Sequence, residues 1–160
     1  MISEYYKNLP KKRMAAGALI LNENDEVLIV KQSYKDYWSI AGGVVDENES
    51  PRDACIREAK EEIGIDLKET ELLCVDYLLN GVGQGESLKF IFFGGKLNEN
   101  EIKEIKVDGK EIVEYKFMKI ENALPLLNER LKKRLPKALE ALKNNAVIYL
   151  EDGEFLRQQK

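Results

Sequence analysis

Three glutamates, Glu58, Glu61 and Glu62, stand close together in the hexapeptide REAKEE. On a helix their carboxylates would share one sector of roughly 100°, where like charges repel and cost stability. Either solvent or a bound cation must offset that cost, and clustered hard oxygen ligands suit Mg²⁺ or Mn²⁺ rather than Zn²⁺. Arg57, four residues before Glu61, can hold that carboxylate by a charge-assisted hydrogen bond. Taken alone, the hexapeptide is more typical of a solvated helix face than of a metal site.

The flanking residues predict the helix that would position these carboxylates. Ser50 suits the N-cap, Pro51 suits the first helical position, and Gly64 suits the left-handed residue that ends a helix. Gly42 and Gly43 precede the helix, in a loop whose backbone can come close to a ligand. The segment therefore predicts a loop and a helix that together face a bound molecule.

Composition limits the classes of protein to which the chain can belong. The chain has 160 residues, 44% hydrophobic and 34% charged, which is typical of a globular protein and predicts one domain over residues 1–160. The net charge of −4 argues against a nucleic-acid backbone or an anionic membrane as a stable partner. The lack of histidine excludes histidine-based zinc sites and Ser-His catalytic triads.

Cysteine usage and the N-terminal segment indicate a cellular compartment. Cys55 and Cys74 are too few for a disulfide framework, and Cys55 is expected to be a buried apolar residue of the helix. The first residues lack the apolar core of a signal peptide, and no apolar run approaches membrane-spanning length. These features predict a cytoplasmic protein that does not bind a membrane.

The remaining apolar runs and turns predict a mixed sheet with helices on both faces. Residues 13–33 form two apolar runs around the polar turn NENDE, which indicates a β-hairpin. Residues 122–144 are expected to be helical, with Pro125 and Pro136 near the starts of helical segments. Further strands are predicted at 37–45, 71–80, 88–97 and 111–120, with a short strand or extended tail at 146–153.

The spacing around the three glutamates resembles a family signature, the MutT-like Nudix box G-x5-E-x7-R-E-U-x-E-E-x-G-U, in which U is apolar. Every defined position between residues 43 and 65 matches, and the matching residues are Gly43, Glu49, Arg57, Glu58, Ala59, Glu61, Glu62, Gly64 and Ile65. The two preceding strands and the helix near the C-terminus also resemble a Nudix domain, so the resemblance covers about residues 13–143.

Membership of the Nudix family implies a fold, a reaction and a set of roles. The fold would be an α/β/α sandwich with a mixed sheet, and the reaction would be Mg²⁺- or Mn²⁺-dependent hydrolysis of a nucleoside diphosphate linked to another moiety. By similarity, Glu58 and Glu62 would be the principal metal ligands and the Gly42 carbonyl another. Glu61 would be a further ligand or would orient the attacking water, with Arg57 orienting Glu61.

Residues outside the box extend the expected site. Many relatives use a further glutamate well past the box, and Glu111 is the candidate here, with Glu114 as its rival and a solvent-facing role as the alternative. Tyr34 is expected to stack on a nucleobase, and the Gly43 backbone to approach the substrate. Trp38 is expected in the core.

Two further segments have plainer interpretations. Basic residues of the C-terminal helix are expected to form a solvated charge run, namely Arg130, Lys132, Lys133 and Arg134. The segment GVGQGES, residues 81–87, lacks the lysine of a phosphate-binding loop and is expected to be a mobile hairpin loop at the mouth of the cleft.

The resemblance therefore implies a hydrolase acting on a small nucleotide, with a slight preference for a (d)NTP. A nucleotide sugar or ADP-ribose is the alternative substrate. A nucleotide-binding module without activity is the alternative from another functional class, but such modules often lose box glutamates, which this chain retains. The protein is expected to be a monomer or homodimer without a stable nucleic-acid partner.

Overall fold

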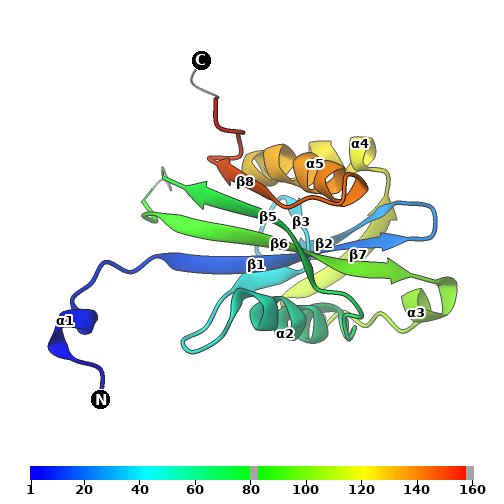
Figure 1. Cartoon of the computed structure of the whole chain (residues 1–160). Helices are drawn as coiled ribbons and strands as arrows, with labels where there is room; N and C mark the ends of the chain where they lie inside the picture. Colours follow the sequence, from blue (N-terminus) through cyan, green and yellow to red (C-terminus); the bar gives the residue numbers. More distant parts are fainter. Residues whose placement is uncertain (80–82, 158–160) are drawn as a thin grey trace.

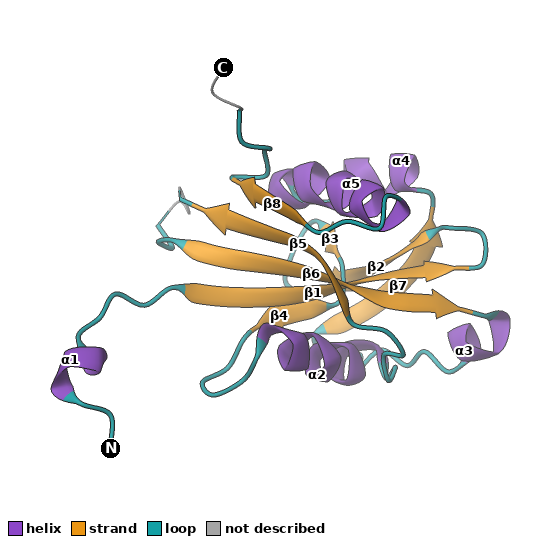
Figure 2. Ribbon diagram, in the orientation of Figure 1, coloured by secondary structure: helices purple, strands orange, loops and turns teal. Residues whose placement is uncertain are grey.

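A mixed β-sheet forms the middle layer of the protein, and helices cover both of its faces (Figure 1). This computed structural model describes residues 1–79 and 83–157. Helix α2 (Pro51–Ile63) lies against one face, whereas α4 (Ile120–Ala123) and α5 (Glu129–Lys143) lie against the other (Figure 2). The predicted α/β/α sandwich with a mixed sheet is confirmed.

The described residues contribute eight strands to this sheet, in the order β3-β2-β1-β6-β5-β8, with β4 paired to β1 and β7 paired to β2. The pairs β1–β6 and β5–β8 are parallel, and the other pairs are antiparallel. A strand forms in every predicted segment, including the last one. Segment 37–45 is interrupted, however, and forms the two short strands β3 and β4, so that Gly42 and Gly43 lie in a strand rather than in the predicted loop. The strands are β1 (Arg13–Asn22), β2 (Val27–Gln32), β3 (Trp38–Ser39), β4 (Gly42–Val44), β5 (Glu71–Leu78), β6 (Ser87–Leu97), β7 (Ile112–Met118) and β8 (Ile148–Glu151).

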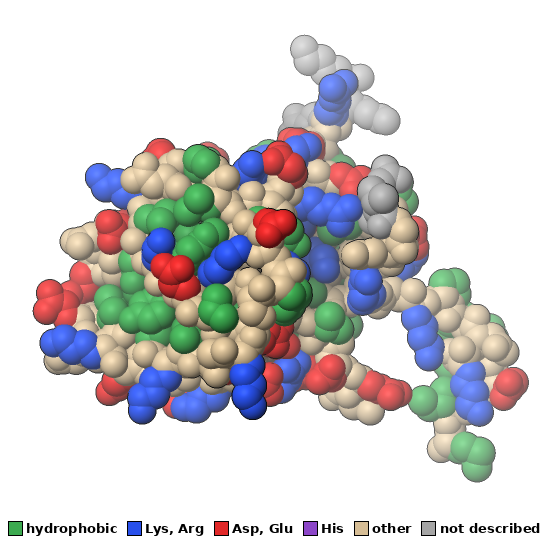
Figure 3. Space-filling view, turned by 180° about the vertical axis from the view of Figure 1, so that it is seen from behind, with side chains coloured by type: hydrophobic (Ala, Val, Ile, Leu, Met, Phe, Trp, Pro, Cys, Tyr) green, Lys and Arg blue, Asp and Glu red, His purple; other side chains and the backbone are tan. Residues whose placement is uncertain are grey.

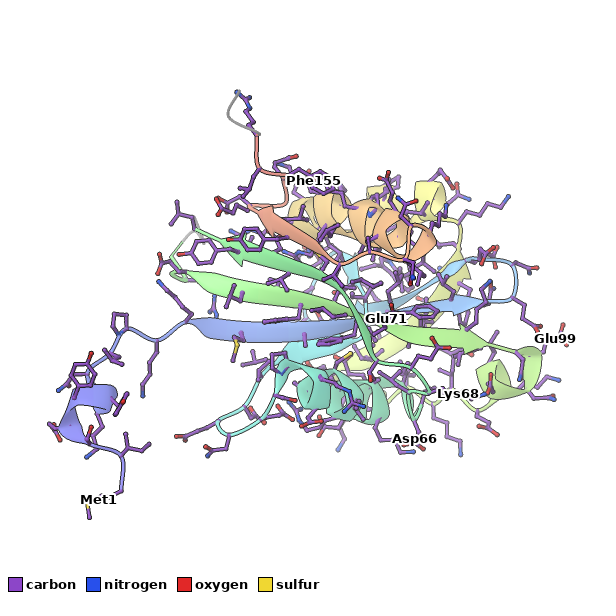
Figure 4. All side chains as sticks on the ribbon, in the orientation of Figure 1. Met1, Asp66, Lys68, Glu71, Glu99 and Phe155 are labelled. Carbon is purple, nitrogen blue, oxygen red and sulfur yellow. The ribbon has the colours of Figure 1, made fainter. Side chains whose placement is uncertain are left out.

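Two short helices were not predicted, α1 (Glu4–Lys7) and α3 (Glu99–Lys103), and the predicted helical segment 122–144 is divided among α4, the 3-10 helix η1 (Leu124–Leu126) and α5. The segment that contains α1 projects away from the sheet, with Met1 at its far end (Figure 4). None of the helices in the described part of the chain is long and apolar enough to cross a membrane.

Alternate side chains of β1 enter two separate apolar cores, one on each face of the sheet. Ala16, Ala18 and Ile20 pack on the α2 side, whereas Leu19 and Leu21 pack on the α5 side. Successive side chains of a strand point to opposite faces, so a strand that is buried on both faces is apolar at nearly every position. This central strand thus anchors both helix layers around the site.

Both ends of α2 form as the sequence predicts. The Ser50 hydroxyl accepts a hydrogen bond of 3.0 Å from the Asp53 N–H, and Pro51 occupies the first turn. Gly64 ends the helix with a φ of 74°, and its N–H donates to the Lys60 carbonyl. The cap and the glycine stop fix where the carboxylate-bearing turns begin and end.

The position of Pro136 differs from the prediction. Pro136 lies inside α5 and not near the start of a helical segment, whereas Pro125 does lie in the first turn of η1. Burial of Leu131, Leu135 and Ala138 against the sheet keeps α5 continuous, although proline removes one hydrogen bond from the helix. Tertiary packing therefore outweighs the local preference of proline.

Candidate active site

An open cleft with a cavity volume of ≈ 890 Å³ is lined by residues of α2 and of the start of α5. Residues of β1 and of its neighbours β4 and β6 also line it. Most of the site residues predicted from the sequence line it. These are Tyr34, Gly42, Gly43, Glu58, Glu61 and Glu111. Glu62 lies behind this lining and is only 3% exposed.

The glycine pair of β4 brings the backbone against two of the α2 carboxylates. The Gly42 N–H donates to Glu62 Oε2 over 2.9 Å. A Cβ at Gly43 would lie 2.3 Å from Glu58 Oε1, and a Cβ at Gly42 would lie 2.2 Å from the Ala16 carbonyl oxygen. Only glycine at these two positions allows this close approach of loop, strand and carboxylate.

Arg57 joins the loop to the helix. Its guanidinium donates to both carboxylate oxygens of Glu49 at 2.8 and 3.0 Å, and to the Val44 carbonyl at 3.1 Å. It also donates to Glu58 at 3.0 Å and to Glu61 at 3.2 Å. The expected Arg57–Glu61 contact is present, but Glu49 is the shorter, two-pronged partner. Arg57 therefore orients Glu49 and Glu58 as well as Glu61.

Burial and neighbouring charges set the proton affinities of these carboxylates. Burial raises the pKa of Glu62 from 4.5 to about 8; the Gly42 N–H opposes this rise, while Glu58 and Glu111 add to it. Burial likewise raises the pKa of Glu58, although Arg57 opposes the rise. Hydrogen bonds from Arg57 lower the pKa of Glu49 to about 2. Glu49 is thus a stable anion, whereas Glu58 and Glu62 lose their protons less readily than an ordinary glutamate does.

Glu111 is carried to the carboxylate cluster by the loop before β7. The Asp108 side chain accepts hydrogen bonds from the N–H groups of Lys110, Glu111 and Ile112 at 2.9, 3.0 and 2.8 Å, which fixes this loop. The Tyr34 hydroxyl donates to Glu111 Oε1 over 3.0 Å. Sequence reasoning missed the role of Asp108, although aspartate is typical of such turns.

The rival candidate, Glu114, lies elsewhere. It is exposed, does not line the cleft, and pairs with Lys116 at 3.1 Å. Of the two glutamates considered from the sequence, Glu111 is the one placed near Glu58 and Glu62.

The donor set suits a divalent metal ion, because carboxylates are hard ligands and because burial, with a smaller contribution from the neighbouring carboxylates, raises the pKa of Glu58 and Glu62. In residues 1–79 and 83–157, however, no three acidic, cysteine or histidine side chains converge as a ready-made metal site. The hydrogen bonds explain this arrangement, since Arg57 holds Glu58 and Glu61 while Gly42 holds Glu62.

Basic residues also line this cleft: Lys35, Lys89, Arg130 and Arg134. The prediction of a solvated charge run is wrong for Arg134, which is 7% exposed and donates to Asp76 Oδ2 over 2.8 Å. The helical spacing of Leu131 and Leu135 could have shown this, because Arg134 lies between them on the face that packs on the sheet.

The aromatic residues differ in their surroundings. Trp38 is 9% exposed and belongs to the core on the α5 side, as predicted. Tyr34 is 63% exposed at the edge of the cleft, where the Lys35 ammonium lies 5.3 Å from its ring centre. The predicted glycine-rich loop at 81–87 includes residues 81 and 82, which lie outside the described residues.

Comparison with known families identifies one match that covers most of the chain. The family model described as the NUDIX domain matches residues 11–142. This range includes both sides of the cleft, from β1 to the end of the carboxylate helix and on to α5.

Individual relatives show the same similarity over shorter segments. The "mRNA-decapping enzyme subunit 2" of Saccharomyces cerevisiae is 36% identical over 94 residues, which are 58% of this chain and 9% of that protein. The "8-oxo-dGTP diphosphatase" of Proteus vulgaris is 36% identical over 67 residues, which are 39% of this chain and 60% of that protein. The chain thus spans less than two thirds of each relative.

A solved structure shows the fold at lower identity. The MutT protein from Methanosarcina mazei Go1 superimposes with a TM-score of 0.67 at 23% identity, and the match covers 86% of this chain and 99% of that one. The layers and the sheet described above are therefore those of a known fold.

Proposed function

The chain belongs to the Nudix family, and on that premise we propose that it is a hydrolase that cleaves the pyrophosphate linkage of a nucleoside diphosphate derivative with Mg²⁺ or Mn²⁺. One observation carries this proposal. The Glu58 and Glu62 carboxylates, both with raised pKa, lie against the glycine pair of β4 beside Glu111. A divalent cation and a phosphate group are the partners that such an arrangement suits.

The α2 carboxylates would hold the metal. Glu58, Glu61, Glu62 and the Gly42 carbonyl are the ligands we propose, with Arg57 orienting the carboxylates through the contacts already described. When bound, the metal would neutralise phosphate oxygens and lower the pKa of the attacking water. Because Gly43 has no side chain, the substrate could come close to its backbone.

Glu111 would take a proton from the attacking water. Its Oε1 already accepts a hydrogen bond from the Tyr34 hydroxyl, which leaves Oε2 to accept the proton. Burial raises the pKa of Tyr34 to about 12, with a further contribution from Glu111, so Tyr34 stays a hydrogen-bond donor at neutral pH. Tyr34 is exposed at the edge of the cleft, so its ring could still stack on a base.

A (d)NTP is the substrate we favour, with a nucleotide sugar or ADP-ribose as the alternative. The relative named 8-oxo-dGTP diphosphatase acts, by its name, on a nucleoside triphosphate, and this likeness supports the first choice. A nucleotide-binding module without activity is the alternative from another class. The chain keeps Glu58, Glu61 and Glu62, whereas Nudix modules that only bind nucleotides often lose these glutamates, and this argues against the alternative.

A panel of nucleotides tests this function. Phosphate or monophosphate release would be measured for dNTPs, 8-oxo-dGTP, ADP-ribose, nucleotide sugars and dinucleoside polyphosphates, with Mg²⁺ and with Mn²⁺. One substrate cleaved far faster than the others, with the rate lost in Glu62→Gln, would support the hydrolase. Nucleotide binding without any product would instead support the binding module.

The remaining predictions about the whole protein are carried forward as proposals. We propose one domain, a cytoplasmic location, and a monomer or homodimer that works without a stable nucleic-acid partner. Basic and acidic side chains are mixed over the face shown in Figure 3, which agrees with a net charge of −4. Size-exclusion chromatography with light scattering would measure the oligomeric state.

A further inference from the structure

The cleft carries opposite charges at its two ends. Glu58, Glu61 and Glu111 come from α2 and the loop before β7, whereas Lys89, Arg130 and Arg134 come from β6 and α5, and Lys35 lies beside Tyr34. The proposed metal and the scissile pyrophosphate would occupy the acidic end. The basic end therefore needs a separate explanation.

The strand pairing fixes the separation of the two ends. Ala15 of β1 pairs with Val44 on one side and with Lys89 of β6 on the other. Two strand spacings of about 4.8 Å place the Lys89 backbone roughly 10 Å from β4. Ala15 and Gly17 are small and line the cleft between them. A ligand can therefore extend from the carboxylates across β1 to Lys89.

Arg134 has a buried donor that no described residue satisfies. Its Nε donates to Asp76 Oδ2, and Asp76 Oδ1 accepts at 2.9 Å from the Gly153 N–H. The Nη2 atom of Arg134 is buried without a hydrogen-bond partner among the described residues. Gln32 Oε1 is the other buried side-chain atom in this condition, and Gln32 also lines the cleft. Buried polar atoms without partners are rare and call for a partner such as a water molecule, an ion or a ligand.

Lys89 completes the basic end. It is half-buried on the same face of the sheet as Arg134, since Lys89 pairs on the neighbouring strand with Asp76, the residue that Arg134 contacts. Burial lowers its pKa to about 8, and Arg13, Arg134, Arg130 and Lys35 lower it further. Asp76, directly opposite Lys89 on β5, is already engaged by Arg134 and Gly153. The charges that act most strongly on Lys89 are therefore positive.

We propose that Lys89 and Arg134, with Lys35 at the rim, bind a phosphate group of the substrate other than the phosphates held at the carboxylate end. This inference rests on the proposed function and names its substrate class, which is a nucleotide with at least three phosphate groups. The free guanidinium nitrogen and the ammonium supply the charge-assisted hydrogen bonds that a phosphate accepts. Asp76 and Gly153 are positioning residues, because they hold Arg134 in place.

Binding of inorganic tripolyphosphate to metal-free protein tests the subsite without using hydrolysis. Calorimetry in EDTA would compare wild type with Lys89→Met, which keeps the shape of the side chain and removes its charge. Lys96→Met is the matched control, because Lys96 is also on β6 but lines a different cavity. We expect Lys89→Met to bind roughly ten-fold more weakly or worse, since one charge-assisted hydrogen bond is lost. Lys96→Met should bind as wild type does.

Lys35→Met gives a second variant that does not disturb the core, because Lys35 lies on a surface loop. A weaker but clear loss of tripolyphosphate binding in this variant supports the subsite, even if Lys89→Met folds poorly. Wild type should also bind ATP more tightly than ADP in EDTA. The difference between the two affinities should be smaller in Lys35→Met and in Lys89→Met.

Equal binding of tripolyphosphate by wild type, Lys89→Met and Lys35→Met would overturn the subsite, as would no binding by wild type. These outcomes leave the proposed hydrolase untouched, since no metal or turnover enters the measurement. The reverse outcome is also distinguishable. If no nucleotide of the panel is cleaved but Lys89→Met and Lys35→Met bind tripolyphosphate more weakly than wild type, the proposed hydrolase is rejected and the subsite is retained.

Discussion

The Glu62 carboxylate is nearly fully buried and accepts a hydrogen bond from the Gly42 N–H. Its pKa of about 8 lies above the ordinary 4.5, so between these pH values the folded protein keeps a proton that the unfolded chain has lost. The free energy of unfolding must therefore fall as pH rises through this window. For metal-free protein, we expect a loss on the order of a few kcal/mol between pH 5 and pH 8.5.

Urea unfolding in EDTA at several pH values measures this loss, and Glu62→Gln is its control. The amide of the glutamine cannot titrate, so the free energy of unfolding should change less between pH 5 and pH 8.5 in this variant than in wild type. Mg²⁺ should also raise the melting temperature of wild type more at pH 8 than at pH 6, because the ion competes with the proton. An unchanged slope in Glu62→Gln would contradict the raised pKa.

Glu111 and Glu114 provide a comparison of two exposed glutamates in the β7 region. Glu111→Gln should lower turnover by roughly a hundred-fold or more, the range expected for loss of a general base. Glu114→Gln should change it little, since Glu114 pairs with Lys116 outside the cleft. Steady-state rates on the nucleotide that wild type cleaves fastest compare the two losses of turnover. A larger loss for Glu114→Gln would assign the role of general base to Glu114 instead of Glu111.

Contacts between residues one helical turn apart could be predicted from the sequence. Contacts between residues that the fold brings together from distant segments could not. The contact of Arg57 with Glu61 follows from their spacing of four. The two-pronged contact with Glu49 depends on how the loop folds back over α2, which helix geometry does not determine. The Asp76–Arg134 pair joins residues 58 positions apart, and no local pattern indicates it.

At the scale of elements, the two glycines of β4 should fail in different ways when replaced by alanine. Gly42 has a φ of 154°, and its Cβ would meet the backbone of Ala16, so Gly42→Ala should destabilise by about 2 kcal/mol or more. At Gly43 the Cβ would meet only the movable Glu58 carboxylate. Gly43→Ala should therefore keep most of the stability and lose activity because Glu58 is displaced.

Thermal unfolding and nucleotide hydrolysis, measured on both variants, separate these two effects. The opposite pattern, in which Gly43→Ala unfolds early and Gly42→Ala remains stable and active, is the result that would refute the close packing of β4 on β1 and α2.

Elements whose ends depend on local chemistry were predicted well. Ser50 and Gly64 mark the ends of α2 through a side-chain cap and a left-handed stop, both of which are readable from a few residues. Pro136 was placed wrongly because burial of Leu135 and Ala138 holds α5 together across it. The position of β8 beside β5 is likewise a result of tertiary packing.

At the scale of the whole molecule, Asp76 ties the sheet to α5 and to the segment after β8. It is 0% exposed, and its oxygens accept from Arg134 and from the Gly153 N–H, 77 residues away. Asp76→Ala leaves the Arg134 charge buried and unpaired, which should destabilise the protein by about 3–5 kcal/mol. Urea unfolding measures the change.

Asp66→Ala is the matched control, since Asp66 pairs with Lys60 at 2.8 Å on the exposed segment after α2 (Figure 4). Removing such a surface pair should cost no more than about 1 kcal/mol. Similar losses of stability in the two variants would show that the Asp76–Arg134 pair does not hold the last strand and α5 to the sheet.

The most direct test of the central claim is the hydrolysis rate of wild type and Glu58→Gln as a function of Mg²⁺, with the nucleotide that wild type cleaves fastest. Wild type should need the ion, and Glu58→Gln should lose roughly a hundred-fold or more of the rate while it keeps its fold. Hydrolysis that persists in EDTA, or a folded Glu58→Gln protein as active as wild type, would contradict a metal-dependent carboxylate site.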